Sequence, residues 1–554
     1  MSDYSQWSKE ALIEHIARLE ASASTTATAA GPSKPHTNPE STFEENAKGT
    51  SPLNHTKKQK GKKTQNLRPF DFSKHSARPI ALKVAYLGWN YHGLAAQETG
   101  SGIPTIESAL FQALYTARLI PDASGKGCNW TRCGRTDRGV SSFGQVVSCL
   151  VRSNLPIGAE GTYNWPSQSE PELKRKRGND DDEDNEGEEN IHETSQDLMD
   201  VSLPDKAYTP VPEDFSEIQY VARLNHILPP DIRILAWSPI APQFSSRFDC
   251  TFRRYRYFFP AEGLDLKRMQ EAAKLYIGAK DYRHFCKVDP SKNVKTYVRT
   301  VLDASVEPLR MPDSNLPTTT NFLAASNELK EDSPEVKVSP ESFLVFEVKG
   351  HAFLWHQVRC MTAILHLIGR GLEPVSLIND LTDLSKHPDN AGRPIYGMAS
   401  EIPLVLVECG FNDGVLDWRV DAEPISQVQQ QNLDALYQSS DAFSQLVVNL
   451  WGQWREHSIK AAQAEALLQQ ISVDSFGSAR NINYRQVFDA YARDGVLGNA
   501  SGESGGYGGK SSKSYIPIMK RKRCDSIEDR TVKYNASKQN KQAKKAATTK
   551  NGSE

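Results

Sequence analysis

The chain has 554 residues, of which 38% are hydrophobic, and its formal net charge is −2. This length indicates two to four units, and the apolar share, below that of a fully globular chain, predicts disordered segments among them. Eight scattered cysteines without a C-x-x-C pair argue against a disulfide framework. No apolar run approaches a membrane span, and the N-terminus lacks a signal pattern, so we expect a soluble intracellular protein.

The N-terminal 77 residues are expected to lie outside the folded core. Residues 1–22 predict an amphipathic helix, since Leu12, Ile13, Ile16 and Leu19 recur at helical spacing. Residues 23–77 are rich in Ser, Thr, Ala, Pro and Asn and predict a disordered basic tail. The run TKKQKGKK within it is typical of a nuclear address or a nucleic-acid contact, and equally of a solvated tail.

Residues 78–160 predict the first half of a folded domain. A β-rich run ends at Tyr86, and a helix follows with Thr105 as its N-cap. CNWTRCG and GQVVSCLV predict two strands that flank CGRTDRGVSSFGQ, the stretch from Cys133 to Gln145. Residues 161–215, with KRKR before a dense acidic run, predict a disordered acidic insertion.

Residues 216–412 predict the second half. RFDCTFRRYRYFFP is typical of a long strand, a polar insertion covers about 306–340, and an amphipathic helix ends at Gly369 and Gly371. Residues 413–494 predict a helical extension, and 495–554 a disordered basic tail that includes KRKR at 520–523. This mixture of helices and hairpin-like strands predicts an α+β fold.

Three stretches could carry chemistry. Asp137 lies beside Arg135 and Arg138, which favour an ionised carboxylate; alone, such a stretch is more often a surface ion-pair turn. On the strand that follows Cys250, two tyrosines project to one face and two arginines to the other, which suits RNA binding and core packing equally well. HAFLWHQVRCM places His356 and Arg359 at the start of an apolar helix.

Four blocks in order resemble the TruA-type tRNA pseudouridine synthases. They are YLGWNYHGLAAQ (86–97), CGRTDRGVSSFGQVVS (133–148), LNHILPPDIRIL with FSSRFDCTFRRYRYFF (224–259), and FEVKGHAFLWHQVRCMTAILHLIGRG (346–371). The eukaryotic group that modifies positions 38 and 39 of the anticodon arm is the most similar. Bacterial members usually have Y-D-G and G-W-Q in the first block, where this chain has Tyr86-Leu87-Gly88 and Gly93-Leu94-Ala95.

The resemblance implies roles residue by residue. Asp137 matches the catalytic aspartate, and Arg135 matches an arginine that displaces the target base. Tyr255 matches the active-site tyrosine, and Arg359 the arginine that pairs with the aspartate. The implied fold has two ferredoxin-like halves around a central cleft, with one mixed, largely antiparallel sheet flanked by helices.

The resemblance also implies an activity and partners. The reaction is the isomerisation of uridine to pseudouridine in the anticodon arm of tRNA, with an aspartate as nucleophile and without a cofactor. A homodimer, no membrane partner and residence in nucleus and cytoplasm are expected. No metal is expected either, because the best-spaced cysteines, Cys128 and Cys133, lack a second pair. The alternatives are a sister synthase acting on other tRNA or mRNA uridines, and a noncatalytic RNA-binding or tRNA-chaperone protein.

Overall fold

The computed structural model describes most of the region between residues 70 and 550. The described residues are 70–97, 103–165, 208–212, 214–291, 294–309, 343–388, 392–420, 423–424, 441–474 and 515–550. The predicted N-terminal helix, the tail up to residue 69 and most of the acidic insertion lie outside them. Among the helices of these residues, none combines the length and the apolar character that a membrane crossing requires.

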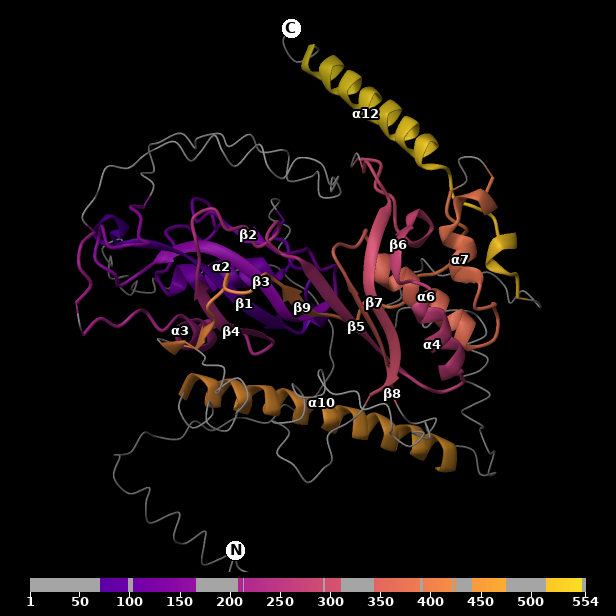
Figure 1. Ribbon diagram of the computed structural model, residues 1–554, viewed down its shortest axis with the longest axis horizontal. Coiled ribbons are helices and arrows are strands. Elements are labelled where there is room, and N and C mark those ends of the chain that lie inside the picture. Colours follow the sequence, from indigo (N-terminus) through magenta and orange to yellow (C-terminus); the bar gives the residue numbers. More distant parts are fainter. Residues whose placement is uncertain are drawn as a thin grey trace, which may run out of the picture. The chain divides into compact units, whose positions relative to one another are not determined.

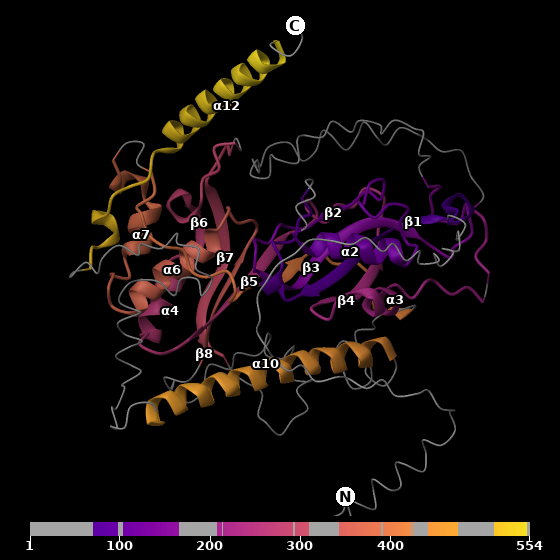
Figure 2. The ribbon, with the colours of Figure 1, turned by 180° about the vertical axis from the view of Figure 1, so that it is seen from behind.

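The first half alternates strands and helices (Figure 1). Its elements are β1 (Ala77–Tyr86), α2 (Ile106–Thr116), β2 (Thr131–Arg132), β3 (Ser141–Arg152), α3 (Tyr220–Ile227) and β4 (Ile232–Pro239). Antiparallel pairing gives the strand order β4–β1–β3–β2, and the alternation is that of a ferredoxin-like unit. As predicted, Thr105 caps α2: its side chain accepts from the Ser108 backbone N–H at 3.2 Å. Figure 2 shows α2 and α3 beside these strands, whose apolar side chains pack against both helices.

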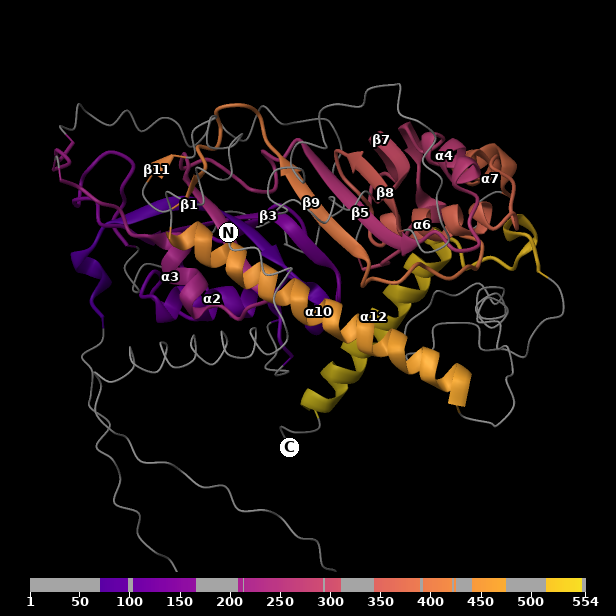
Figure 3. The same ribbon diagram turned by 90° about the horizontal axis from the view of Figure 1, so that it is seen from below.

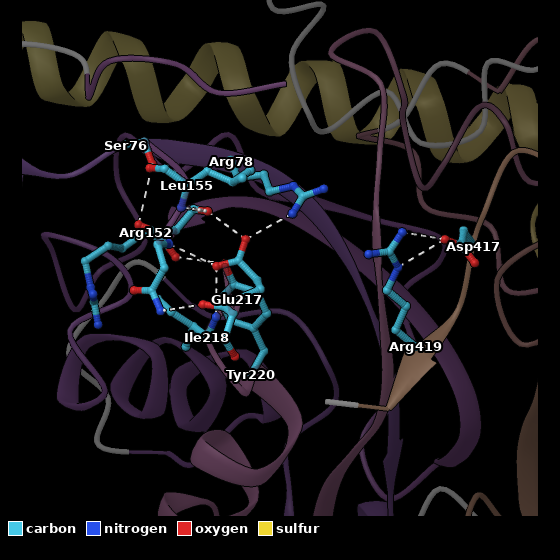
Figure 4. Close-up of polar contacts among 12 residues, drawn as sticks. Ser76, Arg78, Arg152, Leu155, Glu217, Ile218, Tyr220, Asp417 and Arg419 are labelled. Atoms are coloured by element: carbon cyan, nitrogen blue, oxygen red, sulfur yellow. Dashed lines mark hydrogen bonds and ion pairs between the residues drawn. The ribbon is translucent and has the colours of Figure 1, made fainter. Parts of the chain in front are cut away.

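Strand β4 and helix α3 belong to this first half, so the predicted boundary at residue 216 has to move beyond Pro239. Strand β4 pairs with β1 along its length. The buried Glu217 carboxylate before α3 accepts from Arg78 at 3.0 Å and from the Ser153 hydroxyl at 2.6 Å (Figure 4). Both partners lie on or next to the strands of the first half. Strand pairing over such a sequence separation leaves no mark in local periodicity.

The second half repeats the first. Its elements are β5 (Phe252–Pro260), α4 (Leu266–Lys274), β6 (Gly278–Asp281), β7 (Val298–Pro308), β8 (Phe343–Gly350), α6 (Gln357–Gly369), α7 (Leu377–Thr382) and β9 (Leu404–Gly410). The strand order β9–β5–β8–β7 matches that of the first half, and α4 and α6 pack on one face. Ser141 and Ser142 of β3 pair in parallel with Val405 and Leu406 of β9, which joins the halves into one sheet. The expected α+β fold with two ferredoxin-like halves is therefore confirmed.

Short elements complete the described chain. They are β10 (Arg419–Val420), β11 (Glu423–Pro424) and the 3-10 turns Phe72–Lys74, Gly88–Asn90, Arg283–Phe285, Leu384–Lys386 and Ile518–Lys520. The helical extension contains α10 (Asp441–Asp474), which runs beside α3 (Figure 3). Arg233 donates to the Asn449 side chain of α10 at 3.1 Å, and the rings of Trp89 and His457 lie 4.8 Å apart.

The C-terminal segment departs from the predicted disordered tail. Ile518 is fully buried, and its backbone N–H and the Tyr515 hydroxyl both donate to Glu373, each at 2.6 Å. Arg523, within the KRKR run, donates to the Gly392 carbonyl at 3.2 Å. Helix α12 (Ile527–Lys550) follows. A few apolar residues anchor this segment, and they are diluted in its Gly/Ser-rich and basic composition.

Candidate active site

The loop between β2 and β3 carries Asp137, and the residues that follow β1, from Tyr86 to Leu94, hold that loop in place. The Tyr86 hydroxyl lies 2.8 Å from the Thr136 hydroxyl, and the Leu94 backbone N–H donates to the Thr136 carbonyl at 3.2 Å. Gly139 donates its N–H to the Tyr91 carbonyl at 3.1 Å. The residues on both sides of Asp137 are thus fixed by backbone and buried hydroxyl groups, which orients its carboxylate.

Two glycines allow this close approach. Gly93 has φ +89°, and a Cβ there would lie 2.8 Å from the Thr136 carbonyl oxygen. Gly139 has φ +78°, and a Cβ there would lie 2.7 Å from the Glu401 side chain. Both positions combine a left-handed backbone with no room for a side chain, so any other residue would displace the Asp137 loop.

The Asp137 carboxylate meets two side chains from the loop between β8 and α6. The Trp355 indole N–H donates to Oδ1 at 3.1 Å, and Nε2 of His356 lies 3.4 Å from Oδ2. The carboxylate side chain is 30% exposed, which leaves it accessible to a ligand. Burial raises the pKa of Asp137, while the charge of Arg359 and the Trp355 hydrogen bond oppose the rise.

His356 is a neutral neighbour of Asp137 and not a cationic partner. Burial, with the charges of Arg359 and Lys287, lowers the pKa of His356 to about 3. Its backbone has φ +63°, an uncommon value for a residue other than glycine. Such backbone strain concentrates at functional sites, where the surrounding structure compensates for it.

Arg359 lies in the first turn of α6, but the expected pairing with Asp137 is replaced by other contacts. Its Nε donates to the Ala399 carbonyl at 2.8 Å, and its terminal nitrogen donates to Glu401 at 2.8 Å. The guanidinium still favours an ionised Asp137 through its charge. Because Glu401 also lies against Gly139, the Arg359–Glu401 pair supports the Asp137 loop.

Tyr255 of β5 contacts the same β8–α6 loop. Its ring lies edge-on to that of Phe353, with the centroids 5.3 Å apart. Burial raises the pKa of Tyr255, so its hydroxyl stays protonated at neutral pH. The structure gives that hydroxyl no hydrogen-bond partner among the described residues. The β8–α6 loop is therefore the common neighbour of Asp137 and Tyr255.

The structure supports the packing interpretation of this strand, and RNA binding by its side chains stays a prediction. Tyr257 is 2% exposed and belongs to the core of the second half. On the other face, Arg254 and Arg256 form ion pairs with Glu347. Their charges are neutralised within the sheet. Only Tyr255 of this stretch reaches the candidate site.

Cationic side chains surround Asp137 at greater distance. Arg135 and Arg138 are both exposed on the loop. Lys287 lies over the Trp355 ring, 4.4 Å from its centroid. Lys287 also lines a cavity of about 290 Å³ together with Arg283, Arg393 and Arg530. Arg283 is already paired with Asp281, and Asp525 also lines the cavity, so its basic character is partly neutralised.

Sequence reasoning missed three residues of the site. Trp355 was detectable, because it adjoins His356 in the fourth block. Lys287 and Glu401 carry no pattern that separates them from ordinary surface charges, and only the fold places them here.

Sequence comparisons with known proteins support the family that the four blocks indicate. A family model described as tRNA pseudouridine synthase matches residues 272–412. The tRNA pseudouridine(38/39) synthase of Mus musculus is 36% identical over 84% of this chain and 78% of its own length. The synthase of the same name from Saccharomyces cerevisiae is 35% identical over 76% of this chain and 73% of its own length.

More distant relatives have the same type of name. The tRNA pseudouridine synthase A of Methanothrix thermoacetophila is 27% identical over 62% of this chain. Three findings together assign this protein to a family. They are its fold, the four sequence blocks in order, and about one third identity over most of the chain. The chain belongs to the TruA-type tRNA pseudouridine synthase family, in its group of eukaryotic tRNA pseudouridine(38/39) synthases.

Proposed function

We propose that this protein isomerises uridine to pseudouridine at positions 38 and 39 of the tRNA anticodon arm. The observation that carries the proposal is the setting of Asp137: a partly exposed carboxylate, fixed by its loop and contacted by Trp355 and His356 of the β8–α6 loop, which Tyr255 also contacts through Phe353. The 38/39 target rests on the names of the relatives from cattle, mouse, human and yeast.

The chemistry requires one carboxylate and no group donor. The N1–C1′ bond of uridine breaks, the uracil turns, and C5 bonds to C1′; the C5 proton leaves and N1 gains a proton. Substrate and product have the same composition, with the C5 proton exchanged for one on N1, so the reaction consumes no oxidant and no cofactor. Asp137 acts as the nucleophile that holds the intermediate in which the N1–C1′ bond is broken, through a bond to the sugar or to the base.

The neighbours of Asp137 would assist that nucleophile. The Trp355 N–H and the Arg359 charge stabilise the ionised carboxylate, and neutral His356 adds no competing charge. The ring of Tyr255 offers a surface on which uracil stacks, and its protonated hydroxyl can take part in proton transfer. These roles for Tyr255 and Arg359 are part of the proposal.

Access to the reacting atoms requires an everted nucleotide, because C1′ and N1 are shielded within a stacked stem. Arg135 is exposed at the rim of the Asp137 loop and is proposed to fill the gap that the nucleotide leaves. The cavity lined by Lys287, Arg393 and Arg530 is proposed to hold backbone phosphates of the stem.

One assay separates this function from its alternatives. Anticodon-arm transcripts carry tritium at uridine C5, with each uridine replaced by cytidine in turn. We expect tritium release that is lost in Asp137→Ala and in transcripts lacking the uridines at 38 and 39. Release that survives Asp137→Ala would refute the catalytic assignment. Release indifferent to those two uridines would favour the sister synthase, and binding without release a noncatalytic protein.

We also propose a homodimer. Helix α10 exposes several large apolar side chains, of which Leu450, Trp451 and Trp454 lie on one face at 100° per residue; the others are Val448, Ile459 and Leu467. A second copy of this chain would cover such a face. Sedimentation of the wild type and of a Trp451→Glu variant tests this, with a monomeric wild type as the contradicting result. Residence in nucleus and cytoplasm remains part of the proposal, to be checked by imaging the tagged protein.

A further inference from the structure

Three cysteines from distant parts of the chain meet beside the catalytic loop. Cys133 precedes the Asp137 loop, Cys250 precedes β5, and Cys409 lies on β9. Their sulfur atoms all lie within 4.8 Å of one another. Cys133 is 1% exposed and Cys250 8%. Among the described residues, no other group of three or more potential ligands satisfies this spacing.

The spacing suits one thiophilic cation. A Zn–S bond is about 2.3 Å, so three sulfurs around one zinc lie about 3.8–4.0 Å apart. The observed sulfur positions accommodate that arrangement with small rotations of the side chains. Packing alone is the competing explanation, because Cys133 and Cys250 also belong to a small apolar cluster with Val146 and Phe244.

The buried guanidinium of Arg253 beside the sulfur atoms favours a negatively charged group at this place. Arg253 is 8% exposed, and it donates to the carbonyls of His351 at 2.6 Å, Cys133 at 2.9 Å and Arg247 at 3.1 Å. All three acceptors are neutral. Within the described part of the chain, no carboxylate lies within ion-pair distance of Arg253, although a buried cation normally has an anionic partner.

Charge balance selects the kind of ion. Three thiolates around a divalent cation carry one net negative charge, which the Arg253 guanidinium neutralises. A monovalent cation would leave a second negative charge in an apolar cluster. Zinc, divalent and partial to thiolates, fits both the sulfur set and the guanidinium.

We propose that Cys133, Cys250 and Cys409 bind one zinc ion, with Arg253 as its charge-balancing neighbour. The ion would tie the start of the Asp137 loop to the start of β5, which carries Tyr255, and to β9, where the halves join. Its role is to position these elements, and it takes no part in the isomerisation. The sequence-based expectation of no metal considered Cys133 only with Cys128, a partner that the fold does not give it.

The test uses the full chain, expressed with a tag that lacks histidine and purified without chelators. Elemental analysis by mass spectrometry should find about one zinc per chain. Cobalt(II) exchanged into the site should give the near-ultraviolet thiolate-to-cobalt absorption of a sulfur-rich site. Cys250→Ala and Cys409→Ala should lose the metal, whereas Cys149→Ala, which removes a buried thiol outside the cluster, should keep it.

Three results would overturn the proposal: folded wild-type protein without zinc and without the cobalt absorption, equal metal loss in Cys149→Ala, or a disulfide between two of the three cysteines in the purified protein. The first and third are measured on wild type, so misfolded variants cannot obscure them. Asp137→Ala should retain its zinc while losing turnover, which separates this proposal from the catalytic one.

Discussion

Replacing Trp355 by Phe tests how Asp137 is held in its ionised form. The change removes the indole N–H that lies 3.1 Å from Oδ1 but leaves an aromatic ring beneath Lys287. A hydrogen bond to a charged group contributes about 1.5 to 3 kcal/mol. The 3.1 Å length and the 30% exposure of Asp137 place this bond at the low end, about 1.5 kcal/mol.

The loss of this hydrogen bond should change the pH dependence of kcat/KM. Because the lost bond stabilises the carboxylate and not the carboxylic acid, Trp355→Phe raises the pKa of Asp137, and the acid limb of kcat/KM moves to higher pH. On that limb kcat/KM should fall about tenfold, since about 1.4 kcal/mol corresponds to a factor of ten, with little loss on the alkaline side. The assay is tritium release from C5-labelled anticodon-arm RNA across pH 5 to 9, with Trp451→Phe on α10 as the control. An equal loss at every pH would refute the reasoning and make Trp355 an RNA contact.

Three further outcomes are expected. Glu217→Ala should lower the free energy of unfolding by about 3 kcal/mol in urea titrations, because partly buried Arg78 and the buried Ser153 hydroxyl lose their shared acceptor; an effect below 1 kcal/mol would contradict this. Burial lowers the pKa of His366 to about 3, so stability from its neutral form is full above the unfolded pKa of about 6.5 and is lost as pH falls toward 3. Protonation of His366 should cost the wild type about 2 kcal/mol of its free energy of unfolding between pH 6.5 and pH 5, and His366→Phe should abolish that loss. An unchanged dependence of the unfolding free energy on pH in the variant would exclude His366 as its source. Glu401→Gln should weaken the brace on Arg359 and reduce turnover while tRNA binding in filter assays stays unchanged; lost binding would argue for an RNA contact instead.

Local sequence patterns predicted much of the fold because many of its elements carry signals in a few adjacent residues. The N-cap at Thr105, the helix that ends before Gly371 and the strand around Tyr255 each follow from a few adjacent residues. Pairing between distant segments left no such trace. The membership of β4 in the first half and the burial of Ile518 depend on partners far away in the sequence.

The residues of the candidate site likewise divide into those that the sequence could predict and those that only the fold identifies. Asp137, Tyr255, Arg135 and Arg359 could be named because a resemblance marked their positions. The actual partner of Arg359, the acid Glu401, could not be named, because the turn that carries it has no motif of its own. The three cysteines likewise became a group only once the fold brought together the residue after β2, the loop before β5 and strand β9.

The parallel seam between β3 and β9 has a consequence for shortened forms of this protein. Strand β9 pairs with β3 on one side and with β5 on the other, so each half completes its sheet with a strand that comes late in the chain. A product ending before Leu404 would still contain Asp137, Tyr255 and Arg359. It would also leave unpaired the edge of β5 from Phe252 to Tyr257 and the first two residues of β3, and unpaired strand edges invite association between molecules. Premature termination there is therefore expected to yield aggregates in place of a weakly active enzyme, although every residue of the proposed chemistry is present.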